Sequence, residues 1–421
     1  MTVRCDHSAR RQRIYLTIDY VLGFIQTCID MNYERERFID NAYKGDPVAL
    51  AAWLVSIPSV NPALERDGAG EAAIAQACAE LLEGWGLETT ITEPATGRPN
   101  VVGRLEGQGP TILLNGHLDT VGVAGMTIDP FEVSFDGNRM YGRGSCDMKA
   151  GDAALLATAY RLAKEGPRPN LVVALTSDEE HASVGMADLV SEGGPDADLA
   201  IVCEPTNLSV MPAHKGFVWI RALFRGLAAH GSRPDIGVDA IRHAALYLSA
   251  LDSYGRELRS RAAHPLLEYG SVHAGKIHGG TAESVYPDEC ELLLERRTLP
   301  GETPETVVNE FQSVLDMVTA NEPTMEACLT MTLERPGTEV ALSHPLVTGL
   351  LRSGEAFEVE PVVEGMTAWV DAAFLNEKGI PAVCYGPGSI EQAHTDDEWV
   401  DIRQIHSCAN VLEHFVRDLV G

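Results

Sequence analysis

The stretch TILLNGHLD, residues 111–119, joins an apolar run to a polar end that carries His117 and Asp119. A continuous apolar run of this kind is typical of a strand buried on both faces, as in a parallel sheet covered by helices. Side chains two positions apart on a strand project to the same face. The stretch therefore predicts a buried strand that ends with a histidine and a carboxylate on one face.

Apolar runs of the same kind recur along the chain, and helical patterns lie between them. The strand-like runs occupy residues 100–105, 171–176, 199–204 and 381–385, and the helical patterns occupy residues 72–82, 151–164 and 402–416, with another beginning at Pro345. Apolar strands that alternate with helices predict an α/β domain with a mostly parallel central sheet flanked by helices.

The pattern changes between residues 214 and 334. Strand-like runs at residues 217–225, 271–277, 290–297 and 327–333 enclose helical patterns at residues 239–251 and 305–319. The order β-α-β-β-α-β is that of a ferredoxin-like α+β domain. Because the α/β pattern resumes afterwards, we expect residues 214–334 to form a domain, the lid, inserted into a larger domain made of residues 45–213 and 335–421.

Residues 1–44 precede the larger domain, and we interpret them as an N-terminal extension. Four arginines come before an apolar stretch at residues 14–29, in the manner of a signal peptide. Asp19 interrupts this stretch, and no small-residue cleavage site follows it. We therefore favour an added helix, or a start site misplaced upstream of Met31, over a signal peptide.

The composition is that of an ordinary globular protein of more than one domain. The 421 residues are 45% hydrophobic and 22% charged, with a formal net charge of −29. This acidic excess disfavours binding to nucleic acid or anionic membranes and favours cations. Nine cysteines without a CxxC pair indicate reduced thiols. No run approaches the roughly 20 apolar residues of a membrane span, so we expect a cytoplasmic protein with no nucleic-acid or membrane partner.

Four further polar segments follow predicted strands or precede a predicted helix. They are GRGSCDMKAG at residues 142–151, SDEE at 177–180, EPT at 204–206 and AHTDDE at 393–398. Each segment alone also fits an ordinary structural role, such as a helix cap, a solvated acidic turn or a surface loop. His117 and Asp119 alone likewise fit a pair of polar side chains that merely hydrogen-bond to each other. In open α/β sheets, however, functional side chains gather at the carboxyl ends of the strands. Imidazole and carboxylate groups gathered there favour a site for Zn²⁺, Co²⁺ or Mn²⁺.

The five segments, in this order and with the inserted domain, resemble the co-catalytic metallo-amidohydrolase and peptidase family that contains acetylornithine deacetylase, succinyl-diaminopimelate desuccinylase, aminoacylase-1 and carboxypeptidase G. The resemblance covers residues 45–421. It implies two divalent metal ions per subunit, Zn²⁺ being favoured over Co²⁺ or Mn²⁺. The implied ligands are His117 and Glu204 for one ion, Glu180 and His394 for the other, and Asp147 between both.

The resemblance also implies how catalysis is assisted. Asp119 would orient His117. Glu179 would act as the general base that takes a proton from water, which leaves a hydroxide that bridges the ions. In the family the peptide bond after the bridging aspartate is cis, which would place a cis bond between Asp147 and Met148.

The lid carries three further residues that match family motifs. His230 matches a histidine that reaches the active site of the partner subunit in a homodimer formed through the lids, although it also fits an ordinary loop histidine. Arg297 matches an arginine that binds a substrate carboxylate, although it also fits a charged strand end. Ser284 stands where the family usually has asparagine. Ser284 and Arg297 of the lid are expected to contact the substrate, together with Gly388, which belongs to a Gly-Pro-Gly turn of the larger domain.

Glu204 bears on the substrate class. Relatives with glutamate at this ligand position tend to be deacylases and carboxypeptidases, whereas aspartate tends to mark aminopeptidases. We therefore expect a hydrolase that cleaves the amide bond of a small N-acyl amino acid. The alternatives are a metallo-carboxypeptidase or dipeptidase that acts on small peptides, and a metal-free binding protein.

Overall fold

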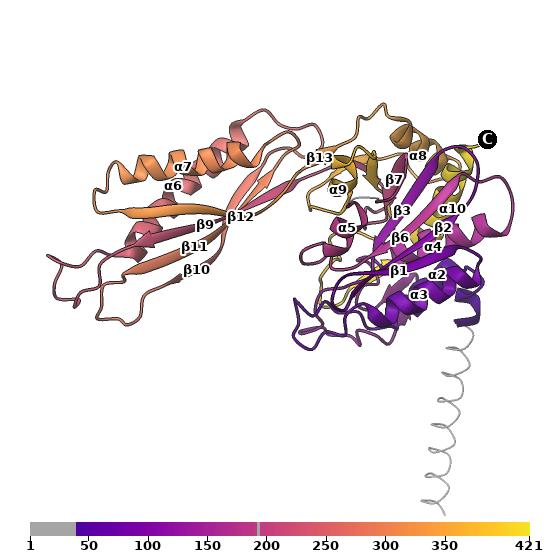
Figure 1. The fold of residues 1–421 in the computed structure, drawn as a ribbon, viewed down its shortest axis with the longest axis horizontal. Coiled ribbons are helices and arrows are strands. Elements are labelled where there is room, and N and C mark those ends of the chain that lie inside the picture. Colours follow the sequence, from indigo (N-terminus) through magenta and orange to yellow (C-terminus); the bar gives the residue numbers. More distant parts are fainter. Residues whose placement is uncertain (1–38, 192–193) are drawn as a thin grey trace, which may run out of the picture.

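The computed structural model describes residues 39–191 and 194–421. Of the extension interpreted at residues 1–44, residues 1–38 therefore lie outside the described residues. The chain forms a larger body built on a nine-stranded sheet and an elongated arm built on a four-stranded sheet (Figure 1). Among the described residues, no helix has the length and apolar character needed to cross a membrane.

The larger body is organised around a mixed sheet whose central strands are parallel. Its strands, in spatial order, are β1 (Glu88–Ala95), β2 (Arg98–Leu105), β6 (Asn170–Thr176), β3 (Thr111–His117), β7 (Leu199–Val202), β15 (Ala382–Cys384), β8 (Val210–His214) and β13 (Thr338–Glu339), with β14 (Val363–Met366) also paired to β8. β6, β3, β7 and β15 run parallel to one another. The α/β fold predicted from the apolar runs is confirmed.

Helices cover both faces of this sheet. One face packs against α2 (Pro47–Val55), α3 (Ala72–Gly84), α4 (Lys149–Lys164), α8 (Pro345–Glu355) and α10 (Ile402–Asp418), and the other against α5 (Val184–Leu189) and α9 (Ala372–Glu377). Ile112 and Leu114 of β3 belong to the first core, and Leu113 belongs to the second. Because strand side chains alternate between faces, His117 continues the row of Leu113 towards the face that α5 and α9 cover.

The arm is the lid predicted from the sequence pattern. Its elements are β9 (Gly216–Arg225), α6 (Ala240–Ser260), β10 (Ser271–Gly279), β11 (Glu289–Thr298), α7 (Pro304–Thr319) and β12 (Glu326–Arg335). The sheet has the antiparallel order β10-β11-β9-β12, and both helices pack on one of its faces around Phe224, Tyr247 and Phe311. The lid therefore has the βαββαβ order and a core of its own. A short three-stranded sheet of β4 (Ser134–Asp136), β5 (Arg139–Tyr141) and β16 (Trp399–Asp401) completes the larger body.

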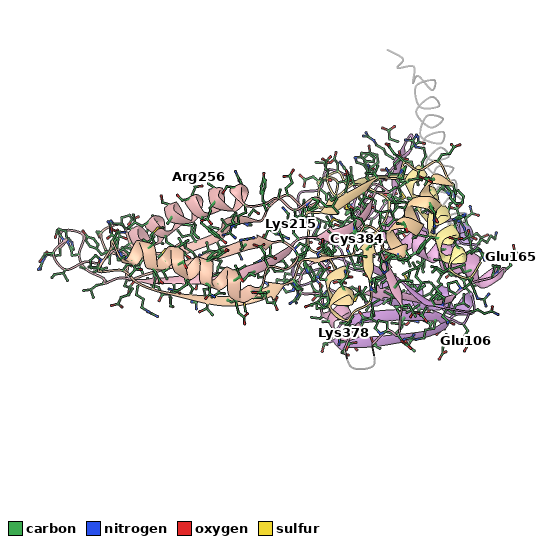
Figure 2. The ribbon with its side chains drawn as sticks, turned by 90° about the horizontal axis from the view of Figure 1, so that it is seen from above. Glu106, Glu165, Lys215, Arg256, Lys378 and Cys384 are labelled. Atoms are coloured by element: carbon green, nitrogen blue, oxygen red, sulfur yellow. The ribbon has the colours of Figure 1, made fainter. Side chains whose placement is uncertain are left out.

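Two chain segments join the lid to the larger body, near Lys215 in Figure 2. His214, at the end of β8, has its Nε2 2.8 Å from Thr338 Oγ1, and Asn376 of α9 donates to the same hydroxyl at 2.9 Å. The Phe217 ring of the lid packs edge-on against the Trp369 ring of the larger body, with centroids 6.0 Å apart. A partly buried polar contact and an aromatic contact thus hold the junction.

His214 makes the junction sensitive to acid. Burial lowers the pKa of His214 to about 4, whereas an unfolded histidine titrates near 6.5. Between those values the unfolded chain binds a proton that the folded chain does not, so this residue makes the free energy of unfolding fall as the pH falls from about 6.5 to 4. We expect acidification from pH 7 to 5 to cost the wild-type protein about 2 kcal/mol more than it costs His214→Gln. Urea unfolding of both proteins at the two pH values measures this difference, and equal losses would contradict the assignment.

Candidate metal centre

Five side chains predicted as metal ligands lie together at the carboxyl ends of the central parallel strands. They belong to five separate segments of the chain: His117 ends β3, Glu180 follows β6, Glu204 follows β7, Asp147 precedes α4 and His394 follows β15. The sheet brings them together because parallel strands with helical crossovers end at the same edge.

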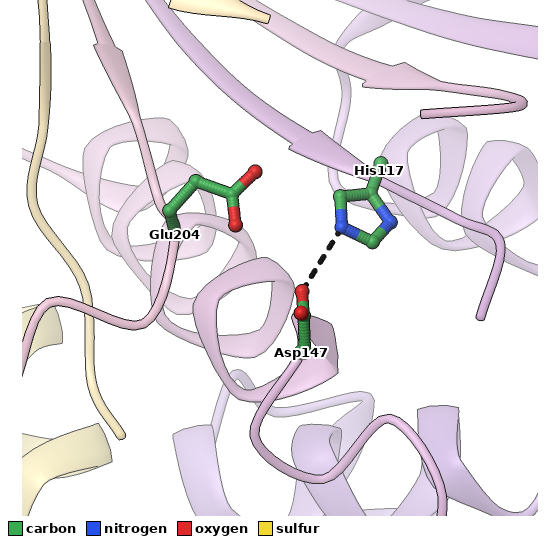
Figure 3. Close-up of side chains that lie close together, drawn as sticks. All are labelled: His117, Asp147 and Glu204. Carbon is green, nitrogen blue, oxygen red and sulfur yellow. Dashed lines mark hydrogen bonds and ion pairs between the residues drawn. The ribbon is translucent and has the colours of Figure 1, made fainter. Parts of the chain in front are cut away.

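Asp147 belongs to two groups of potential ligands. One contains His117, Asp147 and Glu204 (Figure 3), and the other contains Asp147, Glu180 and His394, with the ligand atoms of each group within 4.8 Å of one another. The Oδ1 atom of Asp147 lies 3.2 Å from Nε2 of His117, and its Oδ2 atom lies 3.5 Å from Nε2 of His394. The two oxygens of one carboxylate therefore face two different imidazoles, which is the arrangement required of a ligand shared by two ions.

The electrostatics of the cluster fit divalent cations. Glu180 Oε1 and Glu204 Oε1 are buried, and neither has a hydrogen-bond partner within the described residues. Burial and the nearby Asp147 charge raise the pKa of Glu204 well above its ordinary value and that of Glu180 to about 7. Buried carboxylates that repel one another are costly unless cations lie between them. The donor set, imidazole nitrogen and carboxylate oxygen, suits Zn²⁺ and its neighbours in the transition series.

Asp119 contacts both His117 and the turn after β6. Its backbone oxygen lies 3.0 Å from Nδ1 of His117, whereas its carboxylate lies 3.6 Å from that nitrogen. The carboxylate instead accepts the backbone N–H of Glu179 at 3.0 Å and that of Glu180 at 3.2 Å. Asp119 thus contacts the imidazole through its backbone oxygen, and its carboxylate holds the turn that carries Glu179; its role in orienting His117 remains a prediction.

Glu179 lies at the edge of the cluster. Its Oε2 atom is 4.0 Å from Nε2 of His117, and its side chain is 11% exposed. Burial and the charge of Glu204 raise its pKa well above the ordinary value. The peptide bond between Asp147 and Met148 is cis, as the resemblance implied.

A buried polar network beneath the turn was not predicted from the sequence. Asn61 donates to Asp119 Oδ2 at 2.8 Å. Arg98 pairs with Glu71 at 2.6 Å and with Asp178 at 3.0 Å, and it donates to Asn61 Oδ1. All five residues are buried. The only sequence signal was an arginine two residues before the apolar run at residues 100–105, and arginine is ordinarily a surface residue.

His230 and Ser284 lie far from the cluster within one chain. They occupy adjoining loops, where the backbone N–H of Gly231 donates to the Ser284 carbonyl and His230 pairs with Val285. These loops lie at the far end of the lid (Figure 1). β9, which spans ten residues, extends about 33 Å from the junction towards them.

Arg297 and Gly388 lie closer to the centre. Arg297 is at the junction end of β11, where it pairs with Glu295 at 2.7 Å and lies over the Phe217 ring. Gly388 packs against Cys146, and its backbone N–H already donates to Gln404 Oε1 at 2.8 Å. Contacts of Arg297, Gly388 and Ser284 with substrate remain predictions.

The model of peptidase family M20/M25/M40 matches residues 113–418. The chain belongs to this family. Acetylornithine deacetylase of Myxococcus xanthus is 31% identical over 315 residues, which cover 74% of this chain and 80% of the relative. The enzyme of that name from Vibrio parahaemolyticus is 30% identical over 366 residues, which cover 85% of this chain and 93% of the relative. The family predicted from the five motifs is confirmed, and the chain is an enzyme of a metal-dependent hydrolase family that acts on amides.

Solved structures share the fold. A tripeptidase from Staphylococcus aureus superposes with a TM-score of 0.74 at 24% identity, over 89% of this chain and 98% of that chain. A metallo-carboxypeptidase from Sulfolobus solfataricus gives 0.72 at 16% identity, over 88% and 98%. A dinuclear metal-binding peptidase of the M20 family from Bacillus subtilis gives 0.69 at 15% identity, over 90% and 99%. At these identities the likeness shows the fold alone, including the pairing of a larger domain with a lid.

The Arg98 network yields a prediction about the turn that holds Glu179 and Glu180. Arg98→Met leaves Glu71 and Asp178 buried without their cation, so we expect a loss of about 3–5 kcal/mol in the free energy of unfolding. We also expect faster amide hydrogen exchange in residues 177–183. The control is Arg256→Met in α6 (Figure 2), where the arginine is exposed and, among the described residues, pairs with Asp252 and Ser253 of the same helix. Exchange at residues 177–183 that is equal in the two variants would contradict a supporting role for Arg98.

Proposed function

We propose that this chain is a dinuclear metal-dependent deacylase that cleaves the amide bond of a small N-acyl amino acid, as enzymes named acetylornithine deacetylase do. The observation that carries the proposal is the placement of Asp147 between two groups of ligand side chains. Relatives of that name at 30–31% identity support the substrate class. We further propose residues 45–213 and 335–421 as the catalytic domain and residues 214–334 as the lid.

The residues proposed to hold the ions are those of the two groups. His117 and Glu204 would bind one ion, Glu180 and His394 the other, and Asp147 both; Zn²⁺ is favoured, with Co²⁺ or Mn²⁺ as alternatives. Such a pair of ions would polarise the scissile carbonyl and acidify the attacking water.

Glu179 is the proposed general base. It lies beside His117 at the rim of the cluster, and its backbone is held by the Asp119 carboxylate. A carboxylate so placed takes the proton of the attacking water and delivers it to the leaving amine, which typically contributes ~10²–10⁴-fold to the rate. Asp119 keeps the His117 ring in one orientation through its backbone oxygen.

The lid is proposed to complete the site in a homodimer. His230 lies at the far end of the lid, about 33 Å along β9 from the junction, so it cannot reach the ligands of its own chain without rearrangement. A partner subunit bound through the lids would bring this histidine to the opposite site. Arg297, at the junction end, would pair with the substrate carboxylate, and Ser284 and Gly388 would line the substrate.

A second candidate function is hydrolysis of small peptides by a carboxypeptidase or dipeptidase activity. It is favoured by the fold shared with a tripeptidase and a metallo-carboxypeptidase. The same five ligands and Glu179 would serve either reaction, so substrate comparison separates the two.

Glu179→Ala tests the proposed reaction. With Zn²⁺ bound, we expect wild-type protein to hydrolyse N-acetylornithine and other N-acetyl amino acids faster than dipeptides, and Glu179→Ala to lose at least ~10²-fold in kcat because the proton acceptor is gone. Elemental analysis should find the same metal content in both proteins. Retained turnover in the variant would exclude Glu179 as the base, and faster hydrolysis of dipeptides would favour the second function.

Subunit mixing tests the role of His230. Glu179→Ala and His230→Ala are each expected to be inactive as homodimers. After dissociation and reassociation together, a mixed dimer contains one site with an intact Glu179 that receives the intact His230 of the other chain. We therefore expect the mixture to regain up to about a quarter of wild-type activity, from random pairing of the two chains into a dimer with one complete site. No recovery, with mixed dimers shown to form, would contradict a role for His230 across the dimer.

A further inference from the structure

Glu398 is a buried carboxylate that lies four residues after the proposed ligand His394, directly before β16. It is fully buried, and every partner of its two oxygens is a donor. Oε1 accepts the backbone N–H of Cys146 at 2.8 Å and that of Asp147 at 3.0 Å. Oε2 accepts the backbone N–H of Gly144 at 2.9 Å. The carboxylate is therefore held by the backbone immediately around the proposed bridging ligand.

Two further groups strengthen this contact. Arg143 Nη1 donates to Oε2 of Glu398 at 2.7 Å. The main-chain oxygen of Glu398 accepts the N–H of Gly142 at 3.2 Å and the hydroxyl of Ser145 at 3.3 Å. Side chain and main chain of one residue thus bind the whole loop at residues 142–147.

The loop is shaped to receive an anion. Gly144 has φ +77°, and a Cβ there would lie 2.7 Å from the Thr120 methyl group, so only glycine fits this position without strain. This backbone turn directs the N–H groups of residues 144, 146 and 147 towards one point, as in backbone nests that bind anions. Glu398 supplies that anion from a segment about 250 residues away in the sequence.

We infer that Glu398 is a positioning residue that fixes Asp147 between the two metal-binding groups. The inference rests on the proposed function, because it concerns the same pair of ions. Asp147 Oδ2 lies 3.5 Å from His394 Nε2, so the loop at residues 142–147 and the segment that follows β15 meet at this point. Glu398 is part of the second segment and binds the first, so it sets their separation. Loss of the Glu398 charge would let Asp147 move relative to the other potential ligands of both groups, His117 and Glu204 on one side and Glu180 and His394 on the other.

The variant Glu398→Gln keeps the size of the side chain but turns an NH₂ group towards backbone N–H donors or Arg143. It therefore loses up to two hydrogen bonds and places donors against donors. The matched control is Asp401→Asn, which makes the same chemical change three residues later. Asp401 caps α10 and pairs with Arg403, and its carboxylate makes no hydrogen bond or ion pair with the described residues 142–147.

The experiment titrates metal-free, full-length protein with Zn²⁺ alone by calorimetry, alongside thermal unfolding. Because Asp147 belongs to both groups, Glu398→Gln should weaken the binding of both ions by at least about tenfold, a size typical of residues that support metal ligands. Asp401→Asn should lower the unfolding temperature and leave both affinities within about twofold of wild type. In N-acetyl amino acid hydrolysis at saturating Zn²⁺, Glu398→Gln should lower kcat and leave KM within about twofold.

Three outcomes would overturn the inference. In the first, Glu398→Gln binds both ions as tightly as wild type, which leaves the proposed function intact. In the second, both variants weaken Zn²⁺ binding equally, which makes the effect one of stability. In the third, wild-type protein binds no Zn²⁺, which removes the proposed function as well. If Glu398→Gln does not fold, Glu398→Asp replaces it: the shorter carboxylate cannot reach both pairs of donors, so about a tenfold loss is again expected, and unchanged affinity overturns the inference.

Discussion

The structure depends on one carboxylate that faces two imidazoles. Asp147 directs one oxygen towards His117 and the other towards His394. An imidazole nitrogen has one lone pair and cannot serve two ions, whereas a carboxylate can. Two further potential ligands, Glu204 and Glu180, each join one side of this arrangement. The parallel strands of the sheet bring these distant segments to a common edge, which is where open α/β sheets generally bind their ligands.

Burying several carboxylates close together costs folding free energy because their charges repel one another. Hydrogen bonds from neighbouring buried residues offset part of this cost by holding the backbone segments in place. The turn after β6 is held by the Asp119 carboxylate, which in turn rests on Asn61 and the buried cation Arg98. The loop before α4 is held by Glu398. These two segments, which carry the proposed ligands Glu180 and Asp147, are therefore each supported by a buried group outside the proposed ligand set. Such support keeps ligands in place before any ion binds, which reduces the ordering that binding requires.

Local sequence pattern predicted most of the fold but not its irregular parts. The run TILL and its counterparts became the central strands, and the βαββαβ order of the lid followed from alternating runs. β1 was missed because it is a largely exposed edge strand without an apolar run. The five side chains that lie together as potential ligands could be proposed from the sequence because each follows a strand or precedes a helix in family order. Arg98, Asn61 and the contacts of Glu398 could not, since they pair residues dozens to hundreds of positions apart. The Asp119 contact with the turn was hidden for the same reason.

Anomalous scattering from crystals of the Zn²⁺-loaded protein would locate the ions. We expect two zinc peaks in each chain, one bound by His117 and Glu204, the other by Glu180 and His394, with one oxygen of Asp147 bound to each. A single peak, or two peaks of which one has no contact with Asp147, would contradict this arrangement.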